Sequence, residues 1–444
     1  MKTKLKLLSL PTLIFIIVIC SFSGQAQIPN PALVGYFHNW NISGAPYIDL
    51  DQIDSRYNII EVAFATPQVG TYYDMEFAPS QVSQSQFISQ IQTIQNQGKK
   101  VLISIGGATA YVKLNNLTER DTFISTMNNI INTYGFDGID IDLEGSSIYV
   151  TGGTINSPID AHLINLIDAI KQIMLDYHIL NGKKLLLTMA PETAYVQGGQ
   201  SAFGSIWGAY LPVIHALRDS IDILQVQLYN TGSMLGIDGN LYGQSTGDFI
   251  VAMTEAVIQG FNTQGGQFTG LPASKVAVAL PACPSAAGGG YTNSNVVENA
   301  INYLMGNGTQ VGAYSLQNSA GYPDLAGMMT WSVNWDAASN CGGSYQYAQI
   351  FDNIFGGTVG SNEMGIDNIK IYPNPAEDIV NVLTNNTCEK TYVEIINLDG
   401  KILFMQAYNF QSEIALDISS LQKGVFCLRI STDYEINQFK LIKY

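Results

Sequence analysis

Short runs of apolar and β-branched residues alternate with stretches of helical period between residues 32 and 355. Stretches such as Ser80–Gln97 and Pro158–Leu180 place apolar residues at helical spacing. Eight strands, each followed by a helix, predict an α/β fold of the (β/α)₈ TIM-barrel type rather than a doubly wound open sheet. The eight strand-like runs are Leu33–Trp40, Asn58–Ala65, Lys100–Gly107, Phe136–Glu144, Lys183–Pro191, Ile221–Asn230, Lys275–Pro281 and Leu325–Val333.

The pattern changes after residue 355, where a segment rich in Gly and Ser predicts a linker over residues 356–364. Short strand patterns follow without helical period, and Asn374-Pro375 and Asp399-Gly400 supply turns between them. We therefore expect a small all-β sandwich over residues 365–444. Its seven expected strands are Ile369–Tyr372, Ile379–Thr384, Tyr392–Asn397, Lys401–Met405, Glu413–Ile418, Val425–Ile430 and Phe439–Ile442.

The first residues have the pattern of an export signal. Lys2, Lys4 and Lys6 precede an apolar run from Leu7 to Cys20, and small residues follow. The run contains Pro11 and is shorter than the roughly 20 residues that span a bilayer. We expect a signal peptide over residues 1–26, a barrel over residues 27–355, and a mature protein without a membrane span, located outside the cell or on its surface after passage through the periplasm.

Charge and cysteine content narrow the partners. The 444 residues carry 20 Lys plus Arg against 36 Asp plus Glu, a net charge of −16, which argues against nucleic acid or anionic lipid as a partner. Beyond the leader, Cys283 and Cys341 fall in the barrel and Cys388 and Cys427 in the sandwich, an even number that allows a disulfide in each domain. Metal binding is the weaker alternative, because the chain has no Cys-x-x-Cys and its four histidines are scattered. No cofactor is expected, and we expect a monomer.

The fourth expected strand carries a row of acids. Side chains alternate along a strand, so Asp140, Asp142 and Glu144 share one face while Ile139, Ile141 and Leu143 share the other. The apolar face has to meet the helices, which directs the acids into the barrel and toward its C-terminal mouth, where active sites of such barrels lie. Burying three acids is costly, and we interpret the row as catalytic.

Glu144, the last acid of the row, is the candidate general acid, because burial near like charges keeps a carboxyl protonated. A retaining glycosidase of the ordinary kind needs a second carboxylate about 5 Å away as a nucleophile. Glu192, at the end of the fifth strand, is the one contender in the sequence, and a binding or capping role fits it equally well.

Four motifs on four strands resemble glycoside hydrolase family 18, the chitinases and their relatives, in the branch with compact barrels. They are Asp137-x-x-Asp140-x-Asp142-x-Glu144, Ser104-Ile105-Gly106-Gly107, Gln227-Leu228-Tyr229-Asn230 and Trp331. Asn230 departs from the Asp of many members.

The resemblance implies substrate-assisted hydrolysis with retention, an exception to the two-carboxylate rule. It assigns protonation of the glycosidic oxygen to Glu144, orientation of the substrate acetamido group to Asp142, a shared proton deeper in the barrel to Asp140, and a hydrogen bond to the acetamido oxygen to Tyr229. The substrate-binding residues expected beside these four are Tyr36, Gly106, Gly107, Met189, Gln227, Asn230 and Trp331.

Between the seventh and eighth strands, about 42 residues contain one expected helix, near Asn295–Met305, so no additional α+β insertion walls the cleft. We expect an open cleft lined by Tyr36, Trp40 and Trp331, and internal cleavage of β-1,4-linked N-acetylglucosamine polymers. An endo-β-N-acetylglucosaminidase acting on glycoprotein glycans remains an alternative. A chitin-binding lectin is less consistent, because lectin-like members usually lose the acid that Glu144 supplies.

The last 80 residues resemble the sorting domain of the type IX (Por) secretion system. The matching segments are residues 371–375, 393–401, 421–426 and 439–442. The resemblance implies that the secretion machinery recognises the sandwich. A carbohydrate-binding sandwich is the alternative, and the absence of Trp from this segment argues against it.

Overall fold

The computed structural model describes residues 28–338, 344–356, 369–372, 374–384, 391–397, 401–408, 413–432 and 436–444. The chain divides into two compact units, residues 1–356 and residues 357–444, which are described separately. The expected signal peptide and all of the expected linker except Gly356 lie outside the described residues. No helix of the described ranges is both long and apolar enough to cross a membrane.

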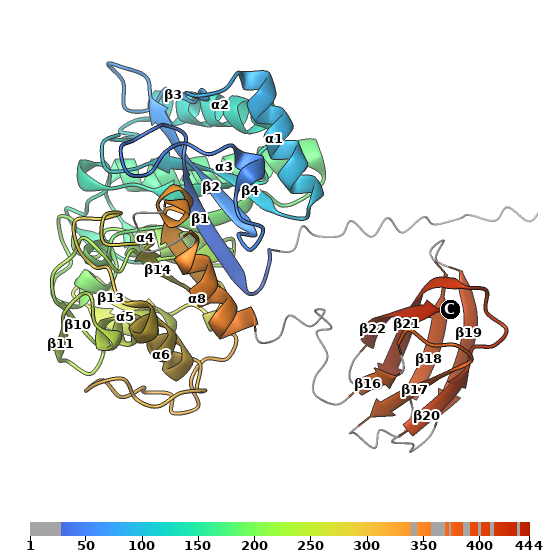
Figure 1. The fold of residues 1–444 in the computed structure, drawn as a ribbon. Coiled ribbons are helices and arrows are strands. Elements are labelled where there is room, and N and C mark those ends of the chain that lie inside the picture. The colour runs from blue at the N-terminus through green and yellow to red at the C-terminus, as the bar shows by residue number, and fades with distance from the viewer. Residues whose placement is uncertain are drawn as a thin grey trace, which may run out of the picture. The chain divides into compact units, whose positions relative to one another are not determined.

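Eight parallel strands form a nearly closed barrel in the first unit, which confirms the expected fold (Figure 1). Their order in the sheet is β14-β15-β1-β2-β4-β5-β8-β9, and the parallel bridges Leu224–Val276 and Gln227–Ala279 join the two ends. β3 (Met75–Glu76) pairs with β2 in antiparallel orientation. The barrel strands are β1 (Ala32–His38), β2 (Ile59–Pro67), β4 (Lys100–Gly106), β5 (Gly138–Asp142), β8 (Leu186–Met189), β9 (Ile223–Leu224), β14 (Ala277–Pro281) and β15 (Gly327–Trp331).

The sixth strand is much shorter than the pattern over Ile221–Asn230 predicts. Beyond Leu224 the backbone still bonds to both neighbours, because Gln227 N donates to Pro191 O at 2.9 Å and Leu228 N donates to Ala279 O at 3.1 Å. These bonds do not form a continuous ladder. The segment nevertheless keeps its place in the barrel wall.

Helices surround the barrel on its outer side (Figure 1). Ser83 and Thr246 cap the starts of α1 and α5 by accepting hydrogen bonds from Gln86 N and Phe249 N, as expected for such residues. Gly135 and Gly182 end α2 and α3 in the left-handed conformation. The helices are α1 (Gln84–Asn96), α2 (Leu117–Tyr134), α3 (Ala161–Asn181), α4 (Leu211–Leu217), α5 (Gly247–Gln259), α6 (Ser294–Leu304), α7 (Val333–Ala337) and α8 (Gln346–Phe355).

Alternation along the strands separates two apolar clusters. Ile139 and Ile141 of β5 lie in the large cluster between sheet and helices, whereas Leu102 and Leu186 lie in a smaller cluster inside the barrel. Positions that alternate with Ile139 and Ile141 therefore face the barrel interior. This parity places the acids of β5 inside.

Loops carry three short hairpins that the sequence pattern did not predict. They are β6 (Gly153–Thr154) with β7 (Ser157–Pro158), β10 (Met234–Leu235) with β11 (Leu241–Tyr242), and β12 (Gly260–Thr263) with β13 (Gly266–Thr269). Between β14 and β15, residues 282–326 are all described and contain α6 and no strand, as expected.

The second unit consists of two antiparallel sheets around a common apolar core that includes Val380, Ile395, Leu416 and Leu428. The sheet orders are β16-β17-β20 and β19-β18-β21-β22. All seven expected strands are present, as β16 (Ile369–Tyr372), β17 (Ile379–Thr384), β18 (Thr391–Ile396), β19 (Ile402–Tyr408), β20 (Glu413–Asp417), β21 (Gly424–Thr432) and β22 (Ile436–Lys443).

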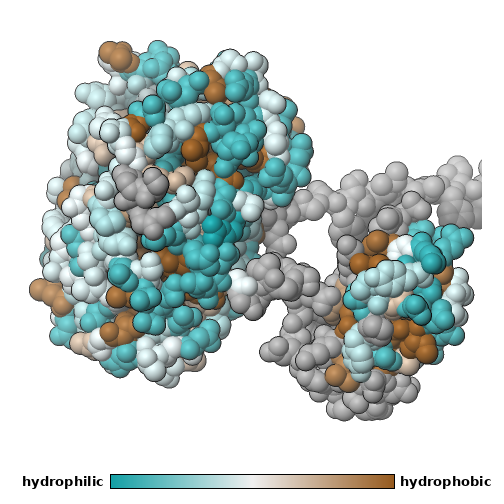
Figure 2. All heavy atoms as spheres, in the orientation of Figure 1, coloured by the Kyte–Doolittle hydropathy of each residue, from teal (hydrophilic) through white to brown (hydrophobic). Residues whose placement is uncertain are grey.

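Exposed apolar residues differ in distribution between the two units. On the visible face of the barrel unit they are scattered among hydrophilic atoms, whereas on the second unit they gather into larger patches (Figure 2). Ile402, Leu403 and Met405 are among the exposed apolar residues of the second unit, and all three lie on the edge strand β19.

Cys283 is disulfide-bonded. Its expected partner, Cys341, lies outside the described residues, and so does Cys388. The pairing of Cys388 with Cys427 of β21 therefore stays a prediction.

Candidate active site

The acids of β5 and of the residues that follow it lie in a row that runs from the barrel interior to its C-terminal mouth. Asp140 is fully buried and Asp142 is 3% exposed, whereas Glu144, two residues past the end of β5, is half-buried. Asp137 lies at the opposite end, where it accepts hydrogen bonds from Gln95 Nε2 at 2.8 Å and Val101 N at 3.0 Å. The first acid of the motif thus ties the strand to its surroundings, and the other three form an inward row.

Two glycines bring the end of β4 close to the end of β5. Gly106 and Gly107 have φ angles of +109° and +81°, which favour glycine. Gly107 N donates to Asp142 O at 2.7 Å. A Cβ on Gly106 would lie 2.5 Å from that same oxygen. Only glycine at position 106 allows this close approach beside Asp142.

Asp140 is held by hydroxyl groups from three other strands. Tyr36 Oη and Ser104 Oγ each donate to its Oδ2 at 2.6 Å, and Thr188 Oγ1 lies 2.8 Å from its Oδ1. Burial raises the pKa of Asp140, and the hydrogen bonds from Ser104, Tyr36 and Thr188 oppose that rise.

Gln227 links the two acids nearest the mouth. Its Nε2 lies 2.9 Å from Asp142 Oδ1, 3.1 Å from Glu144 Oε1 and 2.9 Å from Ala190 O. Burial, followed by the charge of Glu144, holds the pKa of Asp142 well above its usual range. Burial also raises the pKa of Glu144, against hydrogen bonds from Gln227 and Asp142. The pair therefore holds a proton more tightly than free carboxyl groups do, which favours a general acid.

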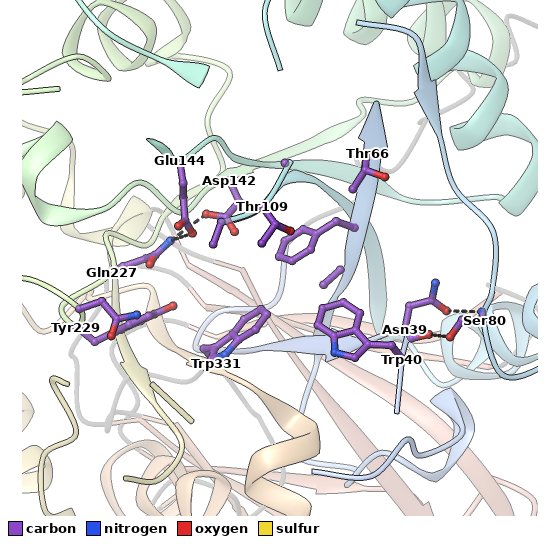
Figure 3. Close-up of a pocket in the computed structure, with 15 residues that line it drawn as sticks. Asn39, Trp40, Thr66, Ser80, Thr109, Asp142, Glu144, Gln227, Tyr229 and Trp331 are labelled. Carbon is purple, nitrogen blue, oxygen red and sulfur yellow. Dashed lines mark hydrogen bonds between the residues drawn. The ribbon is translucent and has the colours of Figure 1, made fainter. Parts of the chain in front are cut away.

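A pocket of about 520 Å³ opens above these acids (Figure 3). Trp331 and Trp40 lie along one side with ring centroids 6.5 Å apart, and Phe64 packs against Trp331 at 6.0 Å with an interplanar angle of 13°. Asp142 and Glu144 lie on the other side (Figure 3). A pocket with an aromatic floor opposite carboxyl groups fits a sugar ring, whose faces are apolar and whose edges are polar.

Tyr229 and Asn230 line the same pocket, beside Gln227. Burial, with the charges of Asp142 and Glu144, holds the pKa of Tyr229 far above its usual value, so its hydroxyl remains a donor. Gly290 packs closely against the backbone of Tyr229, since a Cβ there would lie 2.4 Å from Tyr229 Cα. Asn230 Oδ1 accepts a hydrogen bond from Gly289 N at 3.2 Å.

The sequence of residues 32–369 matches the glycosyl hydrolases family 18, and residues 370–444 match the secretion system C-terminal sorting domain. The chain belongs to glycosyl hydrolase family 18. Its sorting domain indicates export to the cell surface or the medium.

Several family 18 relatives are chitinases by name. The chain is 44% identical over 327 residues to chitinase Chi52 of Paenibacillus xylanexedens, and this match covers 72% of this chain and 62% of that protein. It is 35% identical over 445 residues to chitinase ChiA of Flavobacterium johnsoniae, 94% of this chain and 28% of that protein. The chain thus spans less than two thirds of the length of these curated relatives. A solved family 18 chitinase from Chromobacterium violaceum is 34% identical with a TM-score of 0.63, covering 72% of this chain and 82% of the other.

The structure brings most of the expected family 18 site residues together. Gly106, Asp142, Glu144, Gln227, Tyr229, Asn230 and Trp331 line one pocket, and so does Trp40. Gly107 lies beside it and positions Asp142 through its backbone.

Two expected substrate contacts lie elsewhere. Tyr36 is 1% exposed and lies below the pocket, bound to Asp140, so it does not line the cleft. Met189 is fully buried in the cluster between sheet and helices. Thr188 and Ala190 face the barrel interior, and strand alternation therefore turns Met189 outward.

Glu192 lies near the pocket but does not line it. Burial, with the charge of Glu144, raises its pKa to about 7. Tyr195, whose hydroxyl donates to Gly145 O at 2.9 Å, also hydrogen-bonds Glu192. Glu192 is thus an electrostatic neighbour of the acid pair.

Sequence reasoning missed three polar residues inside the family 18 barrel, Glu61, Thr188 and Gln225. Glu61 and Thr188 are single polar residues in apolar runs, and Gln225 precedes the Gln227-Leu228-Tyr229-Asn230 motif without belonging to it. The signal that could have found Glu61 is its period-two spacing with Ile59 and Ala63, which face the interior. Among the residues the structure describes, no group of His, Cys, Asp and Glu could hold a metal ion.

Proposed function

We propose that the barrel hydrolyses β-1,4 linkages between N-acetylglucosamine units of chitin, with retention of the anomeric configuration. The observation that carries this proposal is the arrangement of acids at the pocket. Among the described lining residues the carboxyl groups are Asp142 and Glu144, which come from one strand end and share the amide of Gln227. A protein nucleophile would need a second carboxylate across the scissile bond. The similarity to relatives that are named chitinases supports chitin as the substrate.

In the proposed reaction the substrate supplies the nucleophile. Glu144 donates its proton to the glycosidic oxygen while the acetamido carbonyl oxygen attacks the anomeric carbon, and the bonding electrons of the broken C–O bond go to the leaving oxygen. Asp142 orients the acetamido N–H and stabilises the positive charge of the oxazolinium ring, and Tyr229 donates to its oxygen. Water then attacks the anomeric carbon from the face that the leaving group vacated, and its proton returns to Glu144.

The test compares two substrate classes and one variant. The mature protein should cleave chitin oligosaccharides and leave high-mannose glycoprotein intact. Glu144→Gln should keep the fold and the binding of oligosaccharide, measured by calorimetry, and lose about 10²- to 10⁴-fold in kcat. Release of glycans from the glycoprotein with intact chitin oligosaccharides would instead establish an endo-β-N-acetylglucosaminidase. Binding without hydrolysis by the wild type would establish a lectin.

Internal cleavage is the proposed mode of action. The connection from β14 to β15 adds only α6, so no domain is inserted there to roof the cleft. A second hollow of about 330 Å³ shares Thr66 and Thr109 with the pocket and carries the exposed rings of Tyr72 and Tyr111. A polymer can therefore continue past the cleavage point along the surface.

The sandwich is proposed to be the segment that the secretion machinery recognises. Its match to a sorting domain supports this partner. Mass spectrometry of secreted protein should find the leader absent and the sandwich removed near residues 356–361. A secreted species that still ends at Tyr444 would contradict the removal of the sandwich.

A further inference from the structure

Glu61 is a buried carboxyl inside the barrel that the proposed reaction does not use. It lies in β2, is fully buried, and faces the interior as its neighbours Ile59 and Ala63 do. Thr188 Oγ1 and Gln225 Nε2 each lie 2.7 Å from its Oε1. An unpaired charge at such a depth is strongly unfavourable. No cation is among the hydrogen-bond partners recorded for Glu61 in the described part of the chain.

The hydroxyl of Thr188 joins Glu61 to Asp140. Its Oγ1 lies 2.7 Å from Glu61 Oε1 and 2.8 Å from Asp140 Oδ1. A hydroxyl has one proton to donate, so it can donate to only one of two carboxyl groups. It must accept at the other contact, and only a protonated carboxyl can donate to it. The unit of Glu61, Thr188 and Asp140 therefore holds one carboxyl proton.

The other hydrogen-bond donors indicate which carboxyl carries this proton. Asp140 Oδ2 accepts from two hydroxyl groups, those of Tyr36 and Ser104, at 2.6 Å. Among the described residues, the hydrogen-bond partners of Glu61 are Thr188 and the neutral amide of Gln225. Donors stabilise the ionised form of a carboxyl, which favours a charge on Asp140. Consistently, burial and then the charge of Asp140 hold the pKa of Glu61 well above its usual range.

We propose that Glu61 is a positioning residue that stays protonated and donates through the Thr188 hydroxyl to an ionised Asp140. The inference rests on the proposed function, because its effect on turnover runs through Asp142, the next acid above Asp140. The titratable groups that face Glu61 are Asp140 and Asp142 on β5 and Tyr36 on β1. With Glu61 neutral, one negative charge and not two lies below Asp142.

Matched substitutions test the direction of the hydrogen bond. In Glu61→Gln the amide N–H₂ can replace the donated proton, so kcat should stay within about tenfold of wild type and the limbs of the pH profile of kcat/KM should not move. Glu61→Leu leaves the Thr188 hydroxyl without that donor, and kcat should fall by about 100-fold with KM little changed. If Glu61 were ionised, Glu61→Gln would remove a negative charge near Asp142 and shift both limbs to lower pH, which would overturn the proposal.

A spectroscopic measurement reads the proton without turnover. The infrared difference spectrum between wild type and Glu61→Gln at neutral pH should show the carbonyl stretch of a protonated carboxylic acid in the wild type only. Absence of that band would refute a protonated Glu61, even if the protein hydrolyses chitin. Presence of the band would support the inference, even if the substrate is not chitin. Should Glu61→Leu fail to fold, Thr188→Val removes the same link and should also lower kcat. Thr188→Ser, which keeps the hydroxyl, should retain most of the kcat of the wild type.

Discussion

The side-chain amide of Gln227 lies 3.1 Å from the Glu144 carboxylate and places a neutral donor against the candidate acid. The same amide lies 2.9 Å from Asp142. Because hydrogen bonds to a carboxylate favour its ionised form, Gln227 lowers the pKa of Glu144 against the effect of burial. The amide thus sets how readily Glu144 gives up its proton.

Replacing Gln227 with Leu should raise the pKa of Glu144. Activity requires protonated Glu144, so the alkaline limb of the pH profile of kcat should move to higher pH while kcat at the optimum falls, since a higher pKa makes a poorer acid. The exposed Gln310 offers the control Gln310→Leu, which should change neither quantity. An alkaline limb that stays in place in Gln227→Leu would show that Gln227 does not tune the acid.

Replacing Glu192 with Gln should shift the alkaline limb of the pH profile of kcat in the opposite direction. With its pKa near 7, Glu192 becomes negative at neutral pH and raises the pKa of the nearby Asp142 and, by the same repulsion, of Glu144. Glu192→Gln removes this charge, so the alkaline limb should move to lower pH. Glu298→Gln, at a half-buried position on α6, is the control. A limb that moves upward or not at all would rule out Glu192 as an electrostatic neighbour of the acid pair.

The row of acids could be predicted from the sequence because three acids at period two on an apolar strand fix both the face and the direction. The sequence could not predict how deep in the barrel Tyr36 lies. Its hydroxyl binds Asp140 below the cleft, so the side chain does not reach the pocket. The expectation for Met189 was wrong because Thr188 faces Asp140 inside the barrel, so strand alternation turns Met189 outward. Glu61 is a lone acid, and only its three-dimensional partners show what it does.

Tyr210 should matter for stability and indirectly for turnover. Its hydroxyl accepts a hydrogen bond from Leu143 N at 2.6 Å, immediately before Glu144, and is fully buried. Tyr210→Phe leaves that N–H buried without its partner, which should lower the free energy of unfolding by about 1–3 kcal/mol. Urea unfolding measures it. Tyr177→Phe loses a 3.5 Å contact to Phe136 O and a hydrogen bond with the exposed side chain of Lys183, and it should cost less. An equal loss of unfolding free energy in both variants would show that the hydrogen bond from Leu143 N to Tyr210 does not contribute the expected stability.

The proposed internal mode of action predicts that cleavage within the polymer is seen from the start. Time courses on soluble chitin should show a rapid fall in viscosity and a mixture of oligomers. In the alternative, a roofed enzyme acting from chain ends would release dimer from the first minutes and preserve viscosity. Removing the aromatic ring in Tyr111→Ala should weaken binding of long oligomers more than of short ones, because Tyr111 lies in the hollow beyond the pocket.

The configuration of the first product tests the substrate-assisted mechanism most directly. Proton NMR during cleavage of a chitin oligosaccharide distinguishes the newly formed anomer before it equilibrates in solution. Attack by the acetamido oxygen followed by water from the opposite face inverts the anomeric carbon twice, so the account predicts the β-anomer. A fully N-deacetylated oligosaccharide, which has no carbonyl to attack with, should remain intact. Initial appearance of the α-anomer would contradict the account, because it would require direct attack by water.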